Sequence, residues 1–393
     1  MNKEFDIVVH GATGFTGRLV VEYLLSRRDT GLRWAMGGRS ADKLAAVRDE
    51  IGAPGETPLV VTDSADPASL AALMARTRLV LTTVGPYQLY GSALVQACAE
   101  SGVDSVDRCG EPAWMRQMID AHQATAQASG ARIVFSCGFD SIPFDLGVLM
   151  LQNEMRQRFG APAPRVRGRV RKMKGTFSGG TAASLKATMA AAATQPGVLD
   201  LLRNPFALTP GFTGPSQPPG HKPMVDEVLG VWVAPFVMAA INTRNVHRSN
   251  YLLGHAWGAD LVYDEMLVTG PGDKGQAMAQ AVAADKSLGG PGGPQPGEGP
   301  SREERESGFY DVLFIGTGAD GSKDGQTLRV SVRGDRDPGY GSTSKMIAES
   351  AICLLQDAQA TPGGIWTPAS AMGHPLIQRL QAFAGLSFAV EAG

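Results

Sequence analysis

Three glycines near the start of the chain have a spacing typical of a phosphate-binding turn. Gly11, Gly14 and Gly17 form a G-x-x-G-x-x-G pattern. An apolar run, Asp6–His10, precedes them, and a helical pattern continues from Arg18. Glycine permits a tight turn and a close backbone approach, while the free N–H groups and the dipole of the following helix attract an anion. The pattern therefore predicts a pyrophosphate site, with a ligand-free glycine turn as the alternative. Its predicted members are Gly11, Thr13, Gly14, Phe15, Thr16 and Gly17.

The segment Met36–Lys43, after the second expected strand, indicates which dinucleotide binds there. A site for NAD places an acidic residue at this strand end, about 20 residues beyond the glycines, to bind the ribose 2′-hydroxyl. Here the strand end instead carries Arg39, Ser40 and Lys43. Because a guanidinium binds phosphate through parallel hydrogen bonds, these residues favour NADP(H). The acidic residue Asp42 follows in the next helix, where an interaction with the helix dipole accounts for it.

Other strand ends supply further cofactor candidates, because ligands of an open parallel sheet bind at the carboxyl ends of its strands. Asp63 follows the third expected strand and contacts the adenine edge or, alternatively, caps the next helix. Gly85 and Pro86 follow the fourth strand and bring the backbone close to a ligand, or form a plain tight turn. We predict that all three residues contact the cofactor.

Four residues are candidates for catalysis. Tyr87 is a potential proton or hydrogen-bond donor, and Ser141 a potential donor to a substrate carbonyl. Asp140 is a candidate to orient the substrate or to bind the ribose, and Arg244 is a candidate from the second half of the chain. Packing or helix capping accounts equally well for each of them.

Short apolar runs alternate with helical patterns over the first part of the chain. Such strands need crossover connections, which build a parallel sheet covered on both faces. We therefore expect a doubly wound, Rossmann-like α/β domain over residues 1–145. The expected strands are Asp6–Val9, Arg33–Met36, Leu59–Thr62, Leu79–Val84, Ser105–Asp107 and Arg132–Ser136. The expected helices are Thr16–Arg28, Asp42–Glu50, Pro67–Ala75, Ala93–Ser101, Ala113–Ala128 and Phe144–Gln157.

A second, α+β domain with a mixed or antiparallel sheet is expected over residues 146–340. Its strand signals are Arg165–Phe177, Tyr310–Gly316 and Thr327–Arg333, and an alanine-rich helix is expected from Ser178 to Ala193. The alternating cations of the first strand indicate a solvated face or, alternatively, a grip on an anionic carrier arm. Two Gly/Pro-rich stretches, 209–223 and 289–300, predict loops.

Composition excludes several classes of protein. The 393 residues exceed the usual size of one domain, and Lys+Arg 36 against Asp+Glu 38 leave a net charge of −2, which argues against nucleic acid as a partner. The longest apolar stretch, Val231–Ile241, is shorter than the ~18–20 residues of a membrane span, so we expect no integral membrane segment. No signal-peptide pattern precedes the first strand, and the four cysteines form no C-x-x-C pair. We expect a cytoplasmic protein without a metal site.

Several motifs together resemble the saccharopine dehydrogenase-like family, in particular the branch that includes trans-acting enoyl reductases. They are GATGFTG (11–17), GGRS (37–40), TTVGPY (82–87), CGE (109–111), GFDSIPFDLG (138–147), SGGTAAS (178–184), APFVMAAINTRNVHRSN (234–250) and GGIWTPASAMG (363–373). The resemblance covers most of the chain. It implies NADPH-dependent reduction of a double bond conjugated to a thioester, with a small-molecule or carrier-bound acyl substrate. It also implies an acyl-carrier or polyketide synthase partner, and a carboxyl-terminal segment, 341–393, that returns to the first domain.

Three functional classes remain open at this point. The first is the NADPH-dependent enoyl reductase that the resemblance implies. The second is a saccharopine-type amino-acid dehydrogenase acting on a C–N bond, which needs several cations, whereas Ala234–Asn250 supplies only Arg244 and Arg248. The third is an NADP(H)-binding sensor without turnover, since the sequence contains no recognisable catalytic set. A homodimer and a monomer are both open.

Overall fold

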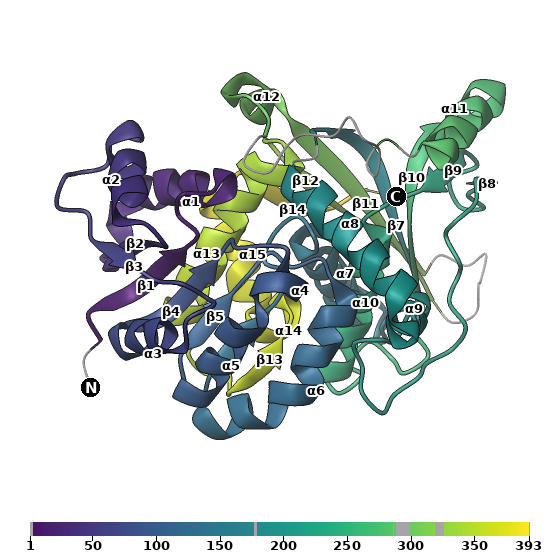
Figure 1. Ribbon diagram of the computed structural model, residues 1–393. Coiled ribbons are helices and arrows are strands. Elements are labelled where there is room, and N and C mark those ends of the chain that lie inside the picture. The colour runs from purple at the N-terminus through teal and green to yellow at the C-terminus, as the bar shows by residue number, and fades with distance from the viewer. Residues whose placement is uncertain (1–2, 177–178, 286, 288–298, 319–325, 393) are drawn as a thin grey trace.

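Two seven-stranded sheets form the framework of the described part of the chain (Figure 1). The computed structural model describes residues 3–176, 179–285, 287, 299–318 and 326–392. In the first sheet every strand pair is parallel, and we call it the parallel sheet. The second contains parallel and antiparallel pairs, and we call it the mixed sheet. The expected fold class, a Rossmann-like sheet combined with an α+β part, is confirmed.

The parallel sheet has the strand order β13-β6-β5-β4-β1-β2-β3. Its strands are β1 (Phe5–His10), β2 (Trp34–Gly38), β3 (Leu59–Val61), β4 (Thr77–Thr82), β5 (Asp104–Val106), β6 (Arg132–Val134) and β13 (Gly364–Trp366). All six expected strands are present. The order runs outward from β1 in both directions, so the crossovers diverge between β1 and β4 and leave a crevice at the carboxyl ends of these strands.

Helices cover both faces of the parallel sheet because its strands are apolar on both sides. In β1, Ile7 and Val9 join a core with α1, α2 and α13 (Thr343–Gln356), whereas Val8 joins a second core with α3, α5 and α6. Helices α2 and α3 begin at the capping side chains of Ser40 and Asp66. The first-half helices are α1 (Phe15–Ser26), α2 (Ala41–Glu50), α3 (Pro67–Arg76), α4 (Tyr87–Tyr90), α5 (Ser92–Ser101), α6 (Pro112–Ser129) and α7 (Ile142–Phe159), with a 3-10 turn at Arg28–Thr30. Of these, the sequence patterns did not predict α4.

The mixed sheet has the order β14-β12-β11-β7-β10-β9-β8. Its strands are β7 (Arg165–Lys174), β8 (Met224–Val225), β9 (Trp232–Pro235), β10 (Val262–Gly270), β11 (Phe309–Thr317), β12 (Thr327–Gly334) and β14 (Leu386–Val390). One interpretation of the sequence expected the cations of β7 to lie on a solvated face, but not all of them do. Arg169 is buried and pairs with Asp226 at 2.6 Å and Asp264 at 2.9 Å.

Helix α7 joins the two sheets and packs on β11 and β12. Gly147 lies at this contact, where a Cβ atom would come within 2.3 Å of the Phe314 ring. The remaining helices of the second half are α8 (Gly179–Thr194), α9 (Pro196–Arg203), α10 (Ala239–Leu252), α11 (Gly272–Ala284) and α12 (Arg302–Ser307). Segment 209–223 has neither helix nor strand, and most of the expected loop 289–300 lies outside the described residues.

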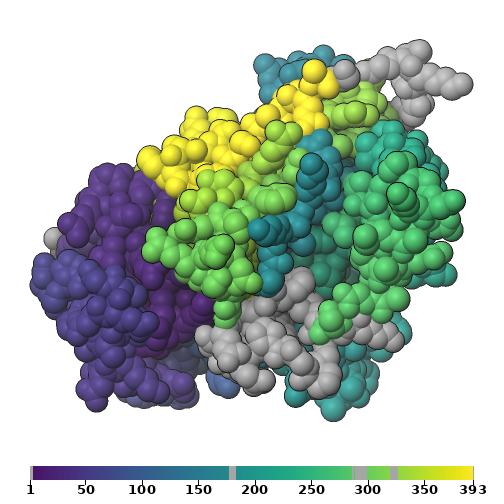
Figure 2. Space-filling view, turned by 90° about the horizontal axis from the view of Figure 1, so that it is seen from above, coloured from purple at the N-terminus to yellow at the C-terminus, as the bar shows by residue number. Residues whose placement is uncertain are grey.

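The carboxyl-terminal elements contribute to both sheets. They are a π-helical turn (Pro338–Ser342), α13 (Thr343–Gln356), β13, α14 (Pro368–Ala371), α15 (Gly373–Phe383) and β14. Strand β13 pairs with β6, and β14 pairs with β12. The buried carboxylate of Glu349 accepts hydrogen bonds from Tyr23 at 2.6 Å and Arg379 at 2.7 Å, which ties α13 to α1 and α15. In Figures 1 and 2 these yellow elements lie between the purple amino-terminal part and the green second half.

Two features are absent from the described residues. No helix there is long and apolar enough to cross a membrane. Within the same part of the chain, no group of three or more His, Cys, Asp or Glu residues is arranged to hold a metal ion.

Candidate active site

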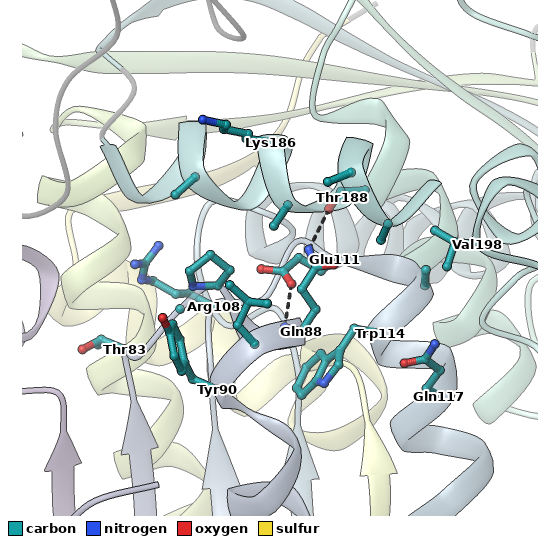
Figure 3. A pocket seen from close by; sticks show the side chains of 18 of the residues that line it. Thr83, Gln88, Tyr90, Arg108, Glu111, Trp114, Gln117, Lys186, Thr188 and Val198 are labelled. Carbon is teal, nitrogen blue, oxygen red and sulfur yellow. Dashed lines mark hydrogen bonds between the residues drawn. The ribbon is translucent and has the colours of Figure 1, made fainter. Parts of the chain in front are cut away.

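A cavity of about 940 Å³ lies at the carboxyl edge of the parallel sheet, beneath α8 (Figure 3). Four segments that are distant in sequence meet around it. They are the start of α1 (Gly14, Phe15, Thr16), the segment after β4 (Thr83, Gly85, Pro86, Gln88), the segment after β5 (Arg108, Glu111, Trp114) and α8 (Lys186, Ala187, Thr188, Ala190, Ala191). The cavity therefore occupies the place that the doubly wound topology assigns to a ligand.

The three glycines of the turn have different roles. Gly11 has φ +92°, and a Cβ atom on it would come within 2.8 Å of Thr83. A Cβ atom on Gly17 would come within 2.1 Å of the Gly11 carbonyl oxygen. Gly14 is exposed at φ −78°, and its added Cβ would meet only the Gly11 oxygen, at 3.4 Å. The chain itself requires glycine at positions 11 and 17, whereas the open space at Gly14 is available to a ligand.

The start of α1 fits an anion. Gly14 is the N-cap residue and provides no side-chain cap, so the first-turn amides lack an acceptor from that residue. The side chain of Phe15 packs edge-on against Tyr340, with ring centroids 5.1 Å apart. Thr16 is buried and Thr13 is half-buried. The predicted turn residues therefore lie together, and uncapped amides, open space at Gly14 and neighbouring hydroxyls match a pyrophosphate.

The residues predicted to bind the adenosine end lie at the ends of β2 and β3, outside the cavity lining. Arg39 and Lys43 are exposed, and none of the ion pairs found among the described residues involves either of them. These unpaired cations fit a 2′-phosphate. Ser40 Oγ accepts a hydrogen bond from the Lys43 amide at 3.3 Å, and Asp63 Oδ1 accepts one from the Ala65 amide at 3.0 Å. Ser40 thus caps α2, a role that the sequence analysis did not assign to it, whereas Asp63 forms a local turn before α3, and the N-cap of α3 is Asp66.

Gly85 and Pro86 line the cavity, whereas the next residue does not. Tyr87 is buried, and its hydroxyl donates to the Thr82 carbonyl oxygen at 3.3 Å and accepts from the Arg108 amide at 3.2 Å. Burial raises the pKa of the Tyr87 phenol well above its usual value. The structure therefore places Tyr87 in the packing beneath the cavity, against Trp114, with ring centroids 5.6 Å apart.

The other three catalytic candidates are not brought together with Tyr87. Ser141 is fully buried and accepts a hydrogen bond from Asn245 of α10 at 2.8 Å. Arg244 lines a separate cavity in the second half of the molecule. Asp140 lines a small cavity of about 60 Å³ that shares Arg108 and Tyr340 with the main one. Of the four, Asp140 is the candidate that adjoins the main cavity.

Arg108 and Asp140 form a pair of incompletely satisfied polar groups at the junction of the two cavities. Arg108 Nε and Asp140 Oδ1 are buried without a hydrogen-bond partner, and neither residue takes part in an ion pair within the described residues. Burial raises the pKa of Asp140 to about 7, and the cation of Arg108 acts in the opposite direction. Asp140 therefore exchanges a proton near neutral pH, and Arg108 has donor capacity left for a ligand.

Sequence reasoning missed the residues that close the cavity from above. Glu111, the N-cap residue of α6, accepts hydrogen bonds from the amides of Tyr87 at 3.0 Å and Gln88 at 2.8 Å, and from Ser184 of α8 at 2.8 Å. The side chain of Gln88 also donates to Thr188 of α8 at 3.1 Å (Figure 3). The CGE motif at the strand end was a signal for Glu111, but nothing local indicates that α8 lies over it.

The cavity continues outward between α6 and α9. A further hollow of about 490 Å³ shares Gln117, Thr194, Gln195 and Val198 with it. Along this path the lining of the main cavity includes the apolar or small side chains of Trp114, Ala190 and Ala191. The site is thus a corridor with the glycine turn at one end, an apolar stretch after it, and an exit flanked by Gln117 and Gln195.

Comparison with known proteins agrees with this geometry. Residues 7–134 match the profile of the saccharopine dehydrogenase NADP binding domain. A relative from Mycobacterium tuberculosis, provisionally named a trans-acting enoyl reductase, is 39% identical over 98% of this chain and 97% of its own. A trans-acting enoyl reductase of Mycobacterium ulcerans is 36% identical over 96% of both chains. The chain belongs to the saccharopine dehydrogenase-like family, in its trans-acting enoyl reductase branch.

Membership of this family identifies the chain as an NADP(H)-dependent oxidoreductase, as the sequence analysis predicted, and the unpaired Arg39 and Lys43 fit that cofactor. The fold agrees as well. Saccharopine dehydrogenase of Saccharomyces cerevisiae, in its apo form, superposes with a TM-score of 0.54 over 99% of this chain and 100% of its own, at 13% identity. At 13% identity, this likeness is evidence for the fold and gives no evidence about the substrate.

Proposed function

We propose that this protein reduces the carbon–carbon double bond of an enoyl thioester with NADPH. The observation that carries the proposal is the corridor itself, whose glycine turn and Gly85–Pro86 segment lie at one end and whose apolar stretch lies at the other. An enoyl thioester is uncharged and elongated, so it needs an apolar path more than a set of ion pairs. The names of the relatives, trans-acting enoyl reductases, support the same reaction class.

The chain's own residues supply polarisation and a proton. Bound NADPH supplies the hydride that adds to the β-carbon. Arg108 donates a hydrogen bond to the thioester carbonyl oxygen and so stabilises the negative charge that develops when the electron pair of the double bond moves toward it. Asp140, which is protonated below about pH 7, delivers the proton that completes the α-carbon. The product is the saturated thioester.

The corridor also suggests how a carrier-bound substrate enters. Its outer end opens between α6 and α9, where Gln117 and Gln195 flank the hollow shared with the cavity. A thioester on a flexible arm can enter there while its carrier stays outside. We therefore propose an acyl carrier of a polyketide synthase as the partner, consistent with the trans-acting character in the names of the relatives.

The two arginines on which the amino-acid dehydrogenase alternative depends do not lie in the candidate active site. Arg244 donates to the carbonyl oxygens of Ala240 and Leu202, and Arg248 donates to those of Leu208 at 2.7 Å and Ile365 at 2.6 Å. Neither arginine lines the candidate active site. Neither arginine is therefore placed to hold the carboxylates of an amino-acid substrate in the corridor, which favours the enoyl reductase.

The test is a turnover assay on the full chain with crotonyl-CoA and with crotonyl bound to a phosphopantetheinylated acyl carrier. We expect NADPH oxidation with a gain of two hydrogen atoms in the acyl group by mass spectrometry. Stoichiometric NADPH binding with no turnover on either substrate would instead favour the sensor. Arg108→Gln and Asp140→Asn should each lower kcat by about 10²–10⁴-fold while NADPH affinity is kept.

A further inference from the structure

A second cavity, of about 760 Å³, lies between α10, strand β10 and the loop that follows α9. Among the described residues, it shares no lining residue with the candidate active site. We propose that it binds a monocarboxylate with an apolar hydrocarbon body, held by Arg244 and His247. This ligand site is distinct from the corridor, and the inference does not depend on the proposed enoyl reductase reaction.

The first observation is a buried cation without a counter-ion. Arg244 is 7% exposed, and its terminal nitrogens donate to the carbonyl oxygens of Ala240 and Leu202. Its Nε atom is buried without a partner, and the ion pairs found in the described part of the chain do not include Arg244. Burial lowers the pKa of this guanidinium to about 10. An anion bound beside it would restore the electrostatic stabilisation lost on burial.

The second observation is an unpartnered imidazole on the same face of α10. His247 follows Arg244 by three residues, is 4% exposed, and packs on Phe206 with ring centroids 4.6 Å apart. Its Nε2 atom has no hydrogen-bond partner. Burial and, second, the cation of Arg244 lower the pKa of His247 to about 3, so it is neutral and contributes a hydrogen bond. One positive charge and two unpartnered nitrogens match the charge and the two oxygens of a carboxylate.

The acidic residues of the cavity do not oppose an anion. Asp264 is neutralised by ion pairs with Arg165 and Arg169. Glu265 accepts hydrogen bonds from Tyr263 at 2.8 Å and Asn242 at 2.9 Å, and burial raises its pKa to about 8. At neutral pH, therefore, neither carboxyl group presents an uncompensated negative charge.

The rest of the lining suits a hydrocarbon body. It includes a group of proline and phenylalanine side chains, Pro205, Phe206, Pro215, Pro218, Pro219 and Phe236, beside polar residues such as Asn204 and Thr243. Gln217 fixes the loop, because its side chain donates to the Leu261 carbonyl oxygen at 3.1 Å and accepts from the Tyr263 amide at 2.9 Å. The cavity wall is thus held in place by the chain before a ligand arrives, which lowers the cost of binding.

Calorimetric titration of the full chain with octanoate tests the proposal, and octanamide serves as the uncharged probe of equal length. We expect saturable octanoate binding and at least about tenfold weaker binding of octanamide. Arg244→Gln should weaken octanoate binding at least about tenfold and abolish the preference for the acid. Equal affinity for the two probes, or no saturable binding of octanoate, would overturn the proposal.

Two further variants keep the test independent of whether Arg244→Gln folds. Ala240 lines the cavity from an exposed position on α10, so Ala240→Leu fills the space with a good helix former and should abolish octanoate binding. Arg203→Gln removes an exposed cation from the same lining and should change the affinity less than about threefold, because an exposed charge is screened. Unchanged octanoate binding in Ala240→Leu would place the ligand elsewhere. NADPH affinity checks the fold of each variant.

Discussion

The Ser184 hydroxyl of α8 donates a hydrogen bond of 2.8 Å to the carboxylate of Glu111, which precedes α6. The same carboxylate holds the amides of Tyr87 and Gln88 after β4. One buried side chain thus fixes the floor of the corridor and the helix above it. Along residues 183–194, α8 has no buried residue, so this contact and the Gln88–Thr188 hydrogen bond are important for its position.

Ser184→Ala should loosen α8 without unfolding the protein. We expect faster amide exchange in residues 183–194 and a higher KM, because the variant loses a hydrogen bond to a carboxylate, worth about 1.5–3 kcal/mol locally. Hydrogen-exchange mass spectrometry measures the first effect and steady-state kinetics the second. Ser26→Ala, at an exposed position at the end of α1, is the control. Unchanged exchange in α8 would contradict the role of this contact.

Gly14→Ala and Gly17→Ala should separate ligand binding from folding. Gly17→Ala should lower the free energy of unfolding by about 1–3 kcal/mol or more, because its Cβ meets backbone 2.1 Å away. Gly14→Ala should leave stability nearly unchanged and weaken NADPH binding about tenfold or more, because the new methyl group enters the ligand's space. Urea unfolding and fluorescence titration with NADPH measure the two effects. A stable Gly14→Ala variant with full NADPH affinity would place the pyrophosphate elsewhere.

Arg39→Asp should change the cofactor preference. We expect a loss of ~1–3 kcal/mol in NADPH binding, on the scale of a charged hydrogen bond, and little change for NADH. The matched control is Arg28→Asp, which makes the same charge change at an exposed position near the end of α1. Comparable losses for both dinucleotides would refute the assignment of Arg39 to the 2′-phosphate.

The raised pKa of Asp140 gives a pH dependence with a definite sign. In the folded protein this pKa is about 7, above the value of about 3.9 for an unfolded chain, so the folded state binds more protons between these values. Stability from Asp140 is therefore present at low pH and lost as the pH rises toward 7. Asp140→Asn should raise stability at pH 8 relative to the native protein, with a smaller gain at pH 5.

The pH dependence of kcat should also depend on Asp140, and here Asp140→Asn should be harmful where it was favourable for stability. As a proton donor, Asp140 is active below about pH 7, so kcat of the native protein should fall as the pH rises through that range. Stopped-flow measurement of single turnovers at several pH values tests this. Glu265, whose pKa burial raises to about 8, lies close enough to interact with Asp140, so Glu265→Gln is a necessary comparison. An identical pH profile in Asp140→Asn would exclude Asp140 as the donor.

Much of the parallel sheet was predictable because its signals are local. Period-two and helical patterns, and turn residues such as Gly11 and Asp66, identified six strands and the helices between them. The seventh strand, β13, is short and pairs with β6 from more than 200 residues away, so no local pattern marks it. The buried position of Tyr87 could not be predicted from local sequence either, because the direction of its side chain depends on packing against Trp114. Arg108 and Glu111 could not be predicted as site residues, because the cavity that they line exists only where α8 lies above them.

Both sheets end in strands from the last part of the chain, β13 in the parallel sheet and β14 in the mixed sheet. During synthesis on the ribosome, β6 and β12 therefore present unprotected hydrogen-bonding edges until residues 364–390 have emerged. Neither sheet is therefore complete before the last part of the chain has been made, so until then β6 and β12 are the strands through which another chain would pair with these sheets.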